Sequence, residues 1–149
     1  MKRLLIANRG EVAIRVARSA KDLGIKTIGI YSEDDVNSLH LSKMDDNYLL
    51  NGKGTTAYLD LKKIVSLAKE CKADAIHPGY GFLSENAGLA REAKKNGISF
   101  IGPEEKTLRL FGNKIKAKEL ALKENVPVIK GTNQKASIKE AENFYKSLK

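Results

Sequence analysis

The sequence IHPGYGFLSEN, residues 76–86, follows a short apolar run at residues 73–76 and precedes a segment with helical periodicity. A strand has to end at Pro78, because proline has no backbone N–H to donate to a neighbouring strand. Gly79 and Gly81 allow the backbone to turn sharply, and Ser84 suits the N-cap of the next helix. The stretch therefore predicts a buried strand, a polar loop and a helix, and open α/β sheets place ligands at such loops.

Strands and helices are predicted to alternate at short intervals around this stretch. The predicted strands are residues 3–7, 26–31, 47–50, 73–76 and 98–101, and the predicted helices are residues 10–23, 59–72 and 84–96. In the first helix, Val12, Val16, Ala20 and Leu23 recur near helical spacing, which predicts the face that packs on the core. The alternation predicts an α/β fold, a Rossmann-like open parallel sheet with helices on both faces.

Polar residues follow several of the predicted strands. Right-handed crossovers bring the carboxyl ends of parallel strands to one edge of the sheet. We therefore expect Asn8, Tyr31, Ser32, residues 77–81 and residues 102–103 along a single edge.

The pattern changes after Pro103. Residues 104–111 and 114–124 are predicted as two helices broken at Gly112, and residues 133–137 as a polar linker. A last helix, residues 137–148, begins with a capping-box pattern at Ser137 and Glu140. We expect one domain at residues 1–111 and a helical linker into a further region at residues 112–149.

Composition excludes several classes of protein. The chain has 149 residues, of which 42% are hydrophobic, and no apolar run approaches the roughly 20 residues of a membrane span. The start MKRLLI is too short for a signal peptide, so a cytoplasmic protein is expected. A single cysteine, Cys71, allows no internal disulfide, and a packed thiol is favoured over a nucleophile.

The net charge of +9 raises the question of nucleic-acid binding. The lysines are spread over many helix faces, and no aromatic cluster accompanies them. We therefore expect a solvated surface and no nucleic-acid partner, with attraction of anionic substrates as the other interpretation.

The first strand ends in Asn8-Arg9-Gly10-Glu11, where dinucleotide-binding folds carry three glycines. Only Gly10 is present, and the charge of Glu11 opposes a pyrophosphate, so a nicotinamide cofactor is not expected. Asn8 is predicted to tie neighbouring loops together, and Arg9 to form an ion pair.

His77 could be a general base or a metal ligand, but only His40 could join it, so a structural histidine bonded to nearby backbone is favoured. Tyr80 lies between two glycines, where little could bury its ring. Glu85 is explained by the dipole of the helix that follows.

Three blocks of the chain resemble the biotin carboxylase family of the ATP-grasp superfamily. They are residues 7–11 (ANRGE), residues 76–86, and residues 100–103 (FIGP) followed by residues 112–114 (GNK). The resemblance covers nearly the whole chain and is thinnest at residues 36–57 and after residue 130. It implies an enzyme that uses ATP, bicarbonate and Mg²⁺ to carboxylate biotin on a carrier.

The resemblance also implies roles for single residues. It places Tyr80 against the biotin ureido ring with Gly81 as its backbone neighbour, and it places Lys114 at the phosphates of ATP. Many relatives have aspartate where Asn113 stands. The remaining implied positions are Asn8, Arg9, His77 and Glu85 at the edge of the active site or in structural roles, and Arg15, Arg18 and Asp22 at a homodimer contact.

The resemblance places the catalytic residues and metal ligands after residue 149. The chain alone is therefore expected to be inactive and to hold no cofactor tightly. The implied partners are the rest of the ATP-grasp domain, a biotin carboxyl carrier and a carboxyltransferase. Acetyl-CoA, propionyl-CoA and pyruvate carboxylases share this front end. Three alternatives stay open: another ATP-grasp ligase of the carbamoyl-phosphate synthase type, a non-catalytic binding or assembly module, and, weakest, a Rossmann dehydrogenase.

Overall fold

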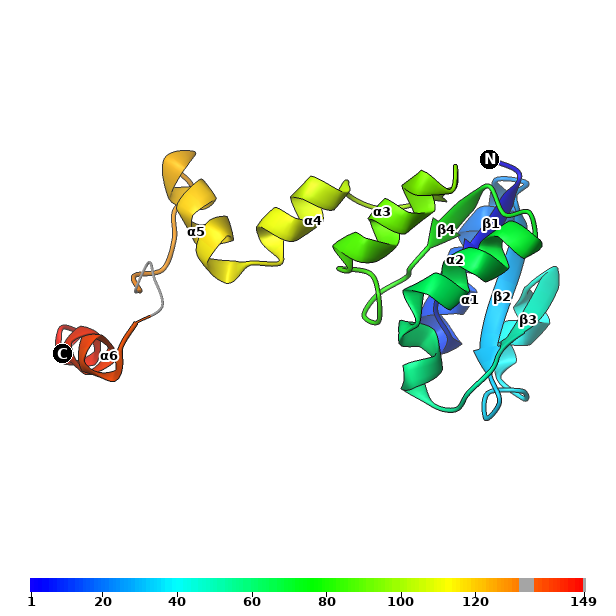
Figure 1. The fold of residues 1–149 in the computed structure, drawn as a ribbon, viewed down its shortest axis with the longest axis horizontal. Coiled ribbons are helices and arrows are strands. Elements are labelled where there is room, and N and C mark those ends of the chain that lie inside the picture. The colour runs from blue at the N-terminus through cyan, green and yellow to red at the C-terminus, as the bar shows by residue number, and fades with distance from the viewer. Residues whose placement is uncertain (132–135, 149) are drawn as a thin grey trace. The chain divides into compact units, whose positions relative to one another are not determined.

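The computed structural model describes residues 1–131 and 136–148 and divides into two compact units, Met1–Glu105 and Lys106–Lys149 (Figure 1). The first unit is a five-stranded parallel sheet in the order β3-β2-β1-β4-β5. Its strands are β1 (Arg3–Ile6), β2 (Lys26–Ser32), β3 (Asp46–Leu50), β4 (Ala75–His77) and β5 (Ser99–Phe100). The predicted alternation and the α/β class are confirmed.

Helices cover both faces of this sheet (Figure 1). They are α1 (Gly10–Asp22), α2 (Leu61–Glu70) and α3 (Ala87–Lys95), with two short 3₁₀ helices, η1 (Leu39–Lys43) and η2 (Thr55–Leu59). The α1 side forms one core cluster with Leu4 and Ile6, whereas α2 and α3 enclose a larger cluster with Leu5 and Ile28. Neighbouring residues of β1 therefore serve opposite faces, as the alternation of side chains along a strand requires.

The predicted face of α1 is confirmed at Ala20 and at Val16, which packs against the same cluster, and is wrong at Leu23. The buried residues are Ala13, Ala17 and Ala20, whereas Leu23 is 75% exposed. Alanines at positions i, i+4 and i+7 form one stripe, and their small side chains let the helix lie close to the strands. Val12 and Val16 flank this stripe and are only partly buried.

The helix after the central loop begins later than predicted. Asn86, not Ser84, is its N-cap, because the Asn86 side chain accepts hydrogen bonds from the N–H groups of Gly88 (2.8 Å) and Leu89 (3.2 Å). The N–H of Ser84 instead donates to the carbonyl of Gly81 (2.8 Å), which closes a turn inside the loop. Glu85 therefore precedes the helix and is exposed.

The second unit consists of short helices. These are α4 (Glu105–Phe111), which starts at the last residue of the first unit, α5 (Lys114–Lys123) and α6 (Ile138–Lys146). The predicted break at Gly112 and the predicted capping box at Ser137 and Glu140 are both confirmed. Most of the predicted linker, residues 133–137, lies outside the described residues. In the part of the chain that the structure describes, no helix has the length and apolar character needed to cross a membrane.

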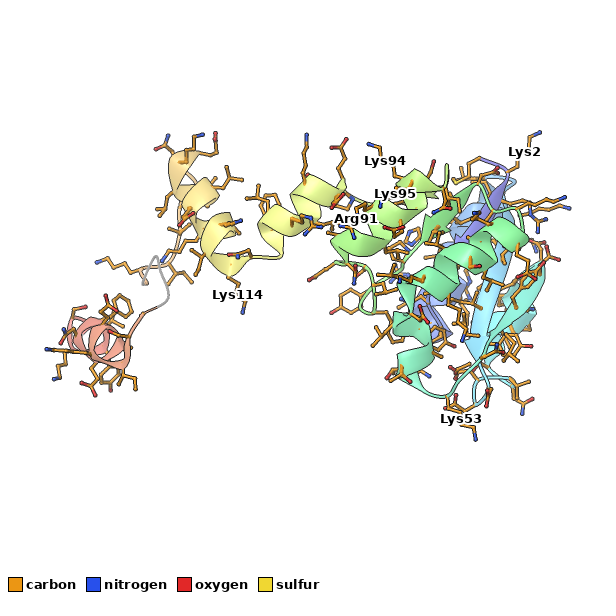
Figure 2. The ribbon with its side chains drawn as sticks, in the orientation of Figure 1. Lys2, Lys53, Arg91, Lys94, Lys95 and Lys114 are labelled. Atoms are coloured by element: carbon orange, nitrogen blue, oxygen red, sulfur yellow. The ribbon has the colours of Figure 1, made fainter. Side chains whose placement is uncertain are left out.

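Basic side chains leave the first unit from separate elements. Figure 2 shows Lys2 before β1, Lys53 in the loop after β3 and Lys94 on α3, with their amino groups directed away from the ribbon. Lys95, also on α3, pairs with Glu92 at 3.3 Å. Arg91 is shared between Glu92 and Glu105 at 3.4 and 3.3 Å. This spread agrees with the interpretation of the charge as a solvated surface.

Candidate functional site

The carboxyl ends of β1 and β4 lie side by side at the centre of the sheet. The chain leaves β1 toward α1 on one face and leaves β4 toward α3 on the other face. Their backbones stay joined past the strands, because the N–H of Ala7 donates to the carbonyl of His77 (2.8 Å). This is a topological switch point, where open α/β sheets bind ligands.

Asn8 fastens the central loop to the end of β1. Its buried amide nitrogen donates to the carbonyl oxygens of Pro78 and Tyr80, each at 2.8 Å, and its amide oxygen accepts from the N–H of Arg9 (2.9 Å). The prediction that Asn8 ties the loops together is confirmed. The amide also explains Gly79, where an added Cβ would lie 2.6 Å from Asn8 Nδ2.

A stack of flat groups holds the other side of the loop. The rings of Phe82 and Tyr58 are stacked, with centroids 5.1 Å apart and planes 6° apart. The guanidinium of Arg9 lies over both rings, 5.5 Å from the Tyr58 centroid and 5.9 Å from the Phe82 centroid. Such contacts combine dispersion with the attraction of a cation to the ring faces.

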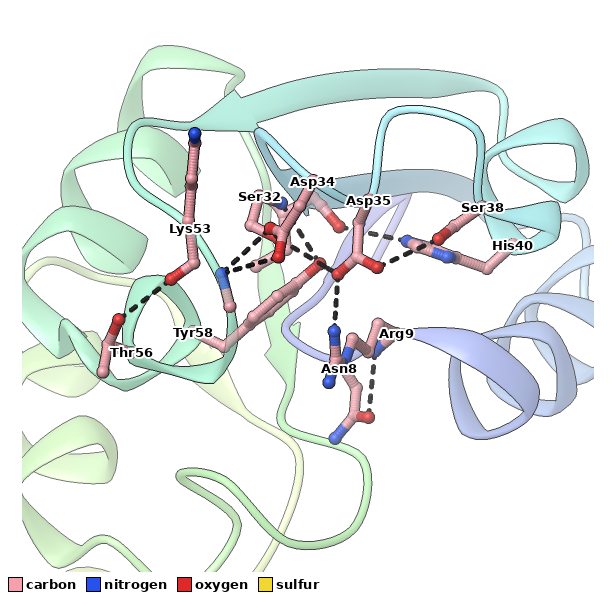
Figure 3. A network of polar contacts seen from close by, with 12 residues as sticks. Asn8, Arg9, Ser32, Asp34, Asp35, Ser38, His40, Lys53, Thr56 and Tyr58 are labelled. Carbon is pink, nitrogen blue, oxygen red and sulfur yellow. Dashed lines mark hydrogen bonds and ion pairs between the residues drawn. The ribbon is translucent and has the colours of Figure 1, made fainter.

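Asp35 fixes the position of this stack (Figure 3). Its carboxylate accepts hydrogen bonds from Arg9 Nη1 (2.8 Å), Tyr58 OH (2.7 Å), Ser32 Oγ (3.0 Å) and Ser38 Oγ (3.1 Å). The predicted ion pair of Arg9 is thus confirmed, with Asp35 as its partner.

Titration follows from these contacts. Burial acts to raise the pKa of Asp35, but the hydrogen bonds from Arg9, Tyr58, Ser32 and Ser38 together lower it to about 2. Burial, followed by the hydrogen bond to Asp35, raises the pKa of Tyr58 to about 12. The network therefore keeps one charge state across the whole physiological range.

Tyr80 projects from this braced loop with 83% of its surface exposed. His77 is partly buried, and its Nδ1 accepts a hydrogen bond from the N–H of Gly79 (2.9 Å). Burial lowers the pKa of His77 and so favours its neutral ring. Because Nδ1 accepts from Gly79, the proton of the neutral ring lies on Nε2. The structural interpretation of His77 is supported.

In the described part of the chain, neither histidine belongs to a group of side chains that could hold a metal ion. His40 is fully buried in η1, and its Nε2 lies 3.2 Å from the carbonyl oxygen of Ile30. Among residues 1–131 and 136–148, no three or more histidine, cysteine, aspartate or glutamate side chains are grouped so that they could hold a metal ion.

The other predicted positions lie on helices. Lys114 is the exposed first residue of α5, directly after the N-cap Asn113, whose side chain accepts from the N–H groups of Ile115 and Lys116 at 3.1 Å each. Asparagine and aspartate cap a helix about equally well.

Arg15, Arg18 and Asp22 are exposed on α1. Arg15 pairs with Glu11 at 3.7 Å, and no ion pair joins Arg18 to Asp22 in the described chain.

Four residues of the network were not predicted: Asp35, Ser38, Tyr58 and Phe82. Asp35 lies in a polar segment of the sequence with no feature that distinguishes it from its neighbours. Tyr58 directly precedes a predicted helix. Phe82 lies within residues 76–86, the strand-to-helix loop. A large aromatic residue directly after Gly-Tyr-Gly was the available signal, since such a loop has few other means of anchoring itself.

Comparisons with known proteins agree on one family. Residues 1–108 match the family described as biotin carboxylase, N-terminal domain. Pyruvate carboxylase of Staphylococcus aureus is 49% identical over 135 residues, which are 89% of this chain and 12% of that protein. The 2-oxoglutarate carboxylase small subunit of Hydrogenobacter thermophilus is 44% identical over 132 residues, which are 89% of this chain and 28% of that protein.

Solved structures give the same answer. The biotin carboxylase domain of a single-chain bacterial carboxylase superimposes with a TM-score of 0.95 at 44% identity, covering 99% of this chain and 34% of the other. The corresponding dimeric domain of Hydrogenobacter thermophilus, in complex with MgADP, ADP and bicarbonate, gives a TM-score of 0.94 at 41% identity, with 99% and 33% covered. The chain thus spans only a minor part of each of these proteins.

Proposed function

Since this chain belongs to the family of biotin carboxylase N-terminal domains, we propose that it forms the front of an enzyme that uses ATP and bicarbonate to carboxylate carrier-bound biotin. The observation that carries the proposal is an exposed Tyr80 on a braced loop at the switch point of the sheet. The names of the relatives point to different acceptors, such as pyruvate and 2-oxoglutarate. The proposed activity is therefore only the ATP-dependent carboxylation of biotin. The 149-residue chain by itself is proposed to be inactive.

Tyr80 is proposed to face the ureido ring of biotin, with Gly81 beside it. The flat, exposed ring of Tyr80 can lie against the flat, uncharged ureido ring. Asn8 and Arg9 shape the edge beneath it, and His77 supports the loop as a neutral hydrogen-bond acceptor.

Lys114 is proposed to contact the phosphates of ATP. A lysine at the first position of a helix adds a flexible positive charge to the partial positive charge of the helix N-terminus, and both favour an anion. The transferable phosphoryl group of ATP activates bicarbonate. The described residues offer no group that fits Mg²⁺, so no step is assigned to a metal on this chain.

The exposed positions Arg15, Arg18 and Asp22 on α1 are proposed to contribute to a homodimer of the complete enzyme. The structure of the dimeric relative supports such an assembly. The rest of the ATP-grasp domain, a biotin carboxyl carrier and a carboxyltransferase are the further proposed partners. The division into a domain at residues 1–111 and a linker at residues 112–149 is likewise our proposal.

Steady-state kinetics of the intact carboxylase that contains this chain test these assignments. Tyr80→Ala should raise the KM for free biotin about tenfold, which corresponds to the loss of roughly 1.4 kcal/mol of binding. Lys114→Ala should raise the KM for ATP by a similar factor. Lys116→Ala, which removes another exposed lysine of α5, is the matched control and should change neither.

Failure of biotin to stimulate ATP cleavage by the intact enzyme would contradict the proposed function. Bicarbonate-dependent ATP cleavage by the purified 149-residue chain, abolished by Lys114→Ala, would contradict its proposed inactivity.

A further inference from the structure

We propose that Arg9, Asp35 and Phe82 are positioning residues that fix Tyr80 for contact with biotin, an inference that rests on the function proposed above. None of the three is assigned a contact with a reacting group. Their effect on the reaction passes through the backbone of the loop that carries Tyr80.

The loop needs external support for its conformation. Gly79, Gly81 and Phe82 have φ values of +67°, +69° and +41°, so three residues around Tyr80 occupy the left-handed region. Phe82 pays a steric penalty there that glycine avoids, and strained residues of this kind persist only where the surroundings hold them.

Two anchors flank Tyr80. On one side, Asn8 binds the carbonyl oxygens of Pro78 and Tyr80. On the other side, the ring of Phe82 is stacked on Tyr58. The side chain of Tyr80 is 83% exposed, so its position is set mainly by these backbone anchors.

Arg9 joins the two anchors. Its backbone N–H donates to Asn8 Oδ1, and its guanidinium covers the rings of Tyr58 and Phe82. A planar guanidinium can stack and form an ion pair at the same time, which lysine cannot reproduce.

Asp35 sets the orientation of that guanidinium. Its side chain is 15% exposed, against 36% for Arg9, so the carboxylate is the more fixed partner of the pair. It also accepts a hydrogen bond from Tyr58 OH at 2.7 Å. Loss of the charge of Asp35 therefore loosens Arg9 and the Tyr58 ring together (Figure 3). The support of Phe82 weakens with them, because its ring contacts both.

Asp35→Asn in the intact carboxylase tests the inference. The chain offers a matched control, because Arg3 and Asp46 form a second arginine–aspartate pair of 2.9 Å at the opposite, amino edge of the same sheet. Asp35→Asn should raise the KM for free biotin about tenfold and leave the KM for ATP nearly unchanged, since a displacement near 1 Å can cost one to two orders of magnitude. Asp46→Asn should change neither KM.

A double-mutant cycle separates positioning from general damage. If Asp35 acts through Tyr80, Asp35→Asn should add nothing to the KM for biotin once Tyr80→Ala is present, because coupled residues are not additive. Arg9→Lys keeps the ion pair and loses the flat stacking group. It should raise the KM for biotin by a smaller factor, and it serves the same cycle if Asp35→Asn does not fold.

Three results would overturn the inference. In the first, Tyr80→Ala raises the KM for biotin and Asp35→Asn does not, so the proposed function stands while the positioning role falls. In the second, the two effects multiply in the double variant, so Asp35 acts independently of Tyr80. In the third, Tyr80→Ala leaves the KM for biotin unchanged, and both the role of Tyr80 and the role of its supports fall.

Discussion

Gly79→Ala should destabilise the protein through a contact that can be specified atom by atom. The added Cβ would lie 2.6 Å from Asn8 Nδ2 and 2.8 Å from Asn8 Cβ and Cγ, closer than real Cβ contacts. Asn8 is only 3% exposed, and its amide is held by the carbonyl oxygens of Pro78 and Tyr80. It cannot move aside without breaking both hydrogen bonds.

The magnitude has two parts. An alanine at φ +67° costs about 1 kcal/mol in backbone strain. Displacement of the buried amide removes two hydrogen bonds, each with a net value of about 1 kcal/mol. We therefore expect Gly79→Ala to lower the free energy of unfolding by about 3 kcal/mol.

Gly81→Ala is the matched control. Its φ is +69°, nearly the same as at Gly79, but no atom lies within 4 Å of the added Cβ. It should cost only the strain of about 1 kcal/mol. Urea unfolding of the 149-residue chain, followed by circular dichroism, measures both variants, and the difference between them isolates the clash with Asn8.

Equal unfolding free energies for the two variants would refute the reasoning, since Asn8 would then yield at no cost. The Asn8→Gly background gives a second check. Glycine removes Asn8 Cβ as well as the amide, so the clash and the two hydrogen bonds are absent there and Gly79→Ala should cost no more than Gly81→Ala.

Three further predictions concern titratable groups. The pKa of Asp35 is about 2 in the fold, against an ordinary 3.8. Its contribution to the free energy of unfolding is therefore complete above pH 4 and is lost as the pH falls toward 2. Over that interval the free energy of unfolding of the unmodified chain should fall by up to about 2 kcal/mol more than that of Asp35→Asn. The pKa of Tyr58 is raised to about 12 from 10.0, so its contribution to the free energy of unfolding is complete below pH 10 and is lost as the pH rises through 12. Tyr58→Phe should remove this alkaline loss and should lower the free energy of unfolding at pH 7 by about 1–2 kcal/mol. Urea unfolding at each pH measures both effects. Cys71 is 5% exposed and burial raises its pKa, so iodoacetamide at pH 8 should alkylate it at least about tenfold more slowly in the native chain than in urea; equal rates would contradict its burial.

The fold could be predicted because its signals are local. Each predicted strand is a short apolar run between turn residues, and strand-helix alternation with right-handed crossovers leaves few topologies open. The errors also have local causes. The predicted face of α1 included its valines because they are more hydrophobic than alanine. Small residues, however, let a helix approach a sheet more closely, and the buried residues of α1 are alanines. Ser84 was preferred to Asn86 as N-cap although both residue types suit that position.

The site was predicted only where one strand end determines it. Asn8 follows β1, and the end of β4 had to lie beside it or close by, so its role in tying loops together could be foreseen. The meeting of Asp35, Tyr58 and Phe82 depends on three loops that arrive from different strands. No periodicity records how such loops bend, and the sequence shows only a polar segment, a tyrosine before a helix and an aromatic residue after Gly-Tyr-Gly.

The charges at the sheet edge and the charge at the start of α5 suit different ligands. Around Tyr80, the charge of Arg9 is matched by that of Asp35, and His77 is neutral. This edge therefore suits an uncharged ring better than a phosphate, because a phosphate would find no free cation in the braced network. Lys114, by contrast, presents an exposed positive charge at a helix N-terminus. On the proposed assignment, the sheet edge recognises the neutral biotin ring by shape, and α5 contributes the charge that ATP requires. The two residues should therefore not substitute for each other. An added lysine on α5 should not restore biotin binding lost with Tyr80, and an aromatic residue at position 114 should not restore ATP binding lost with the ammonium.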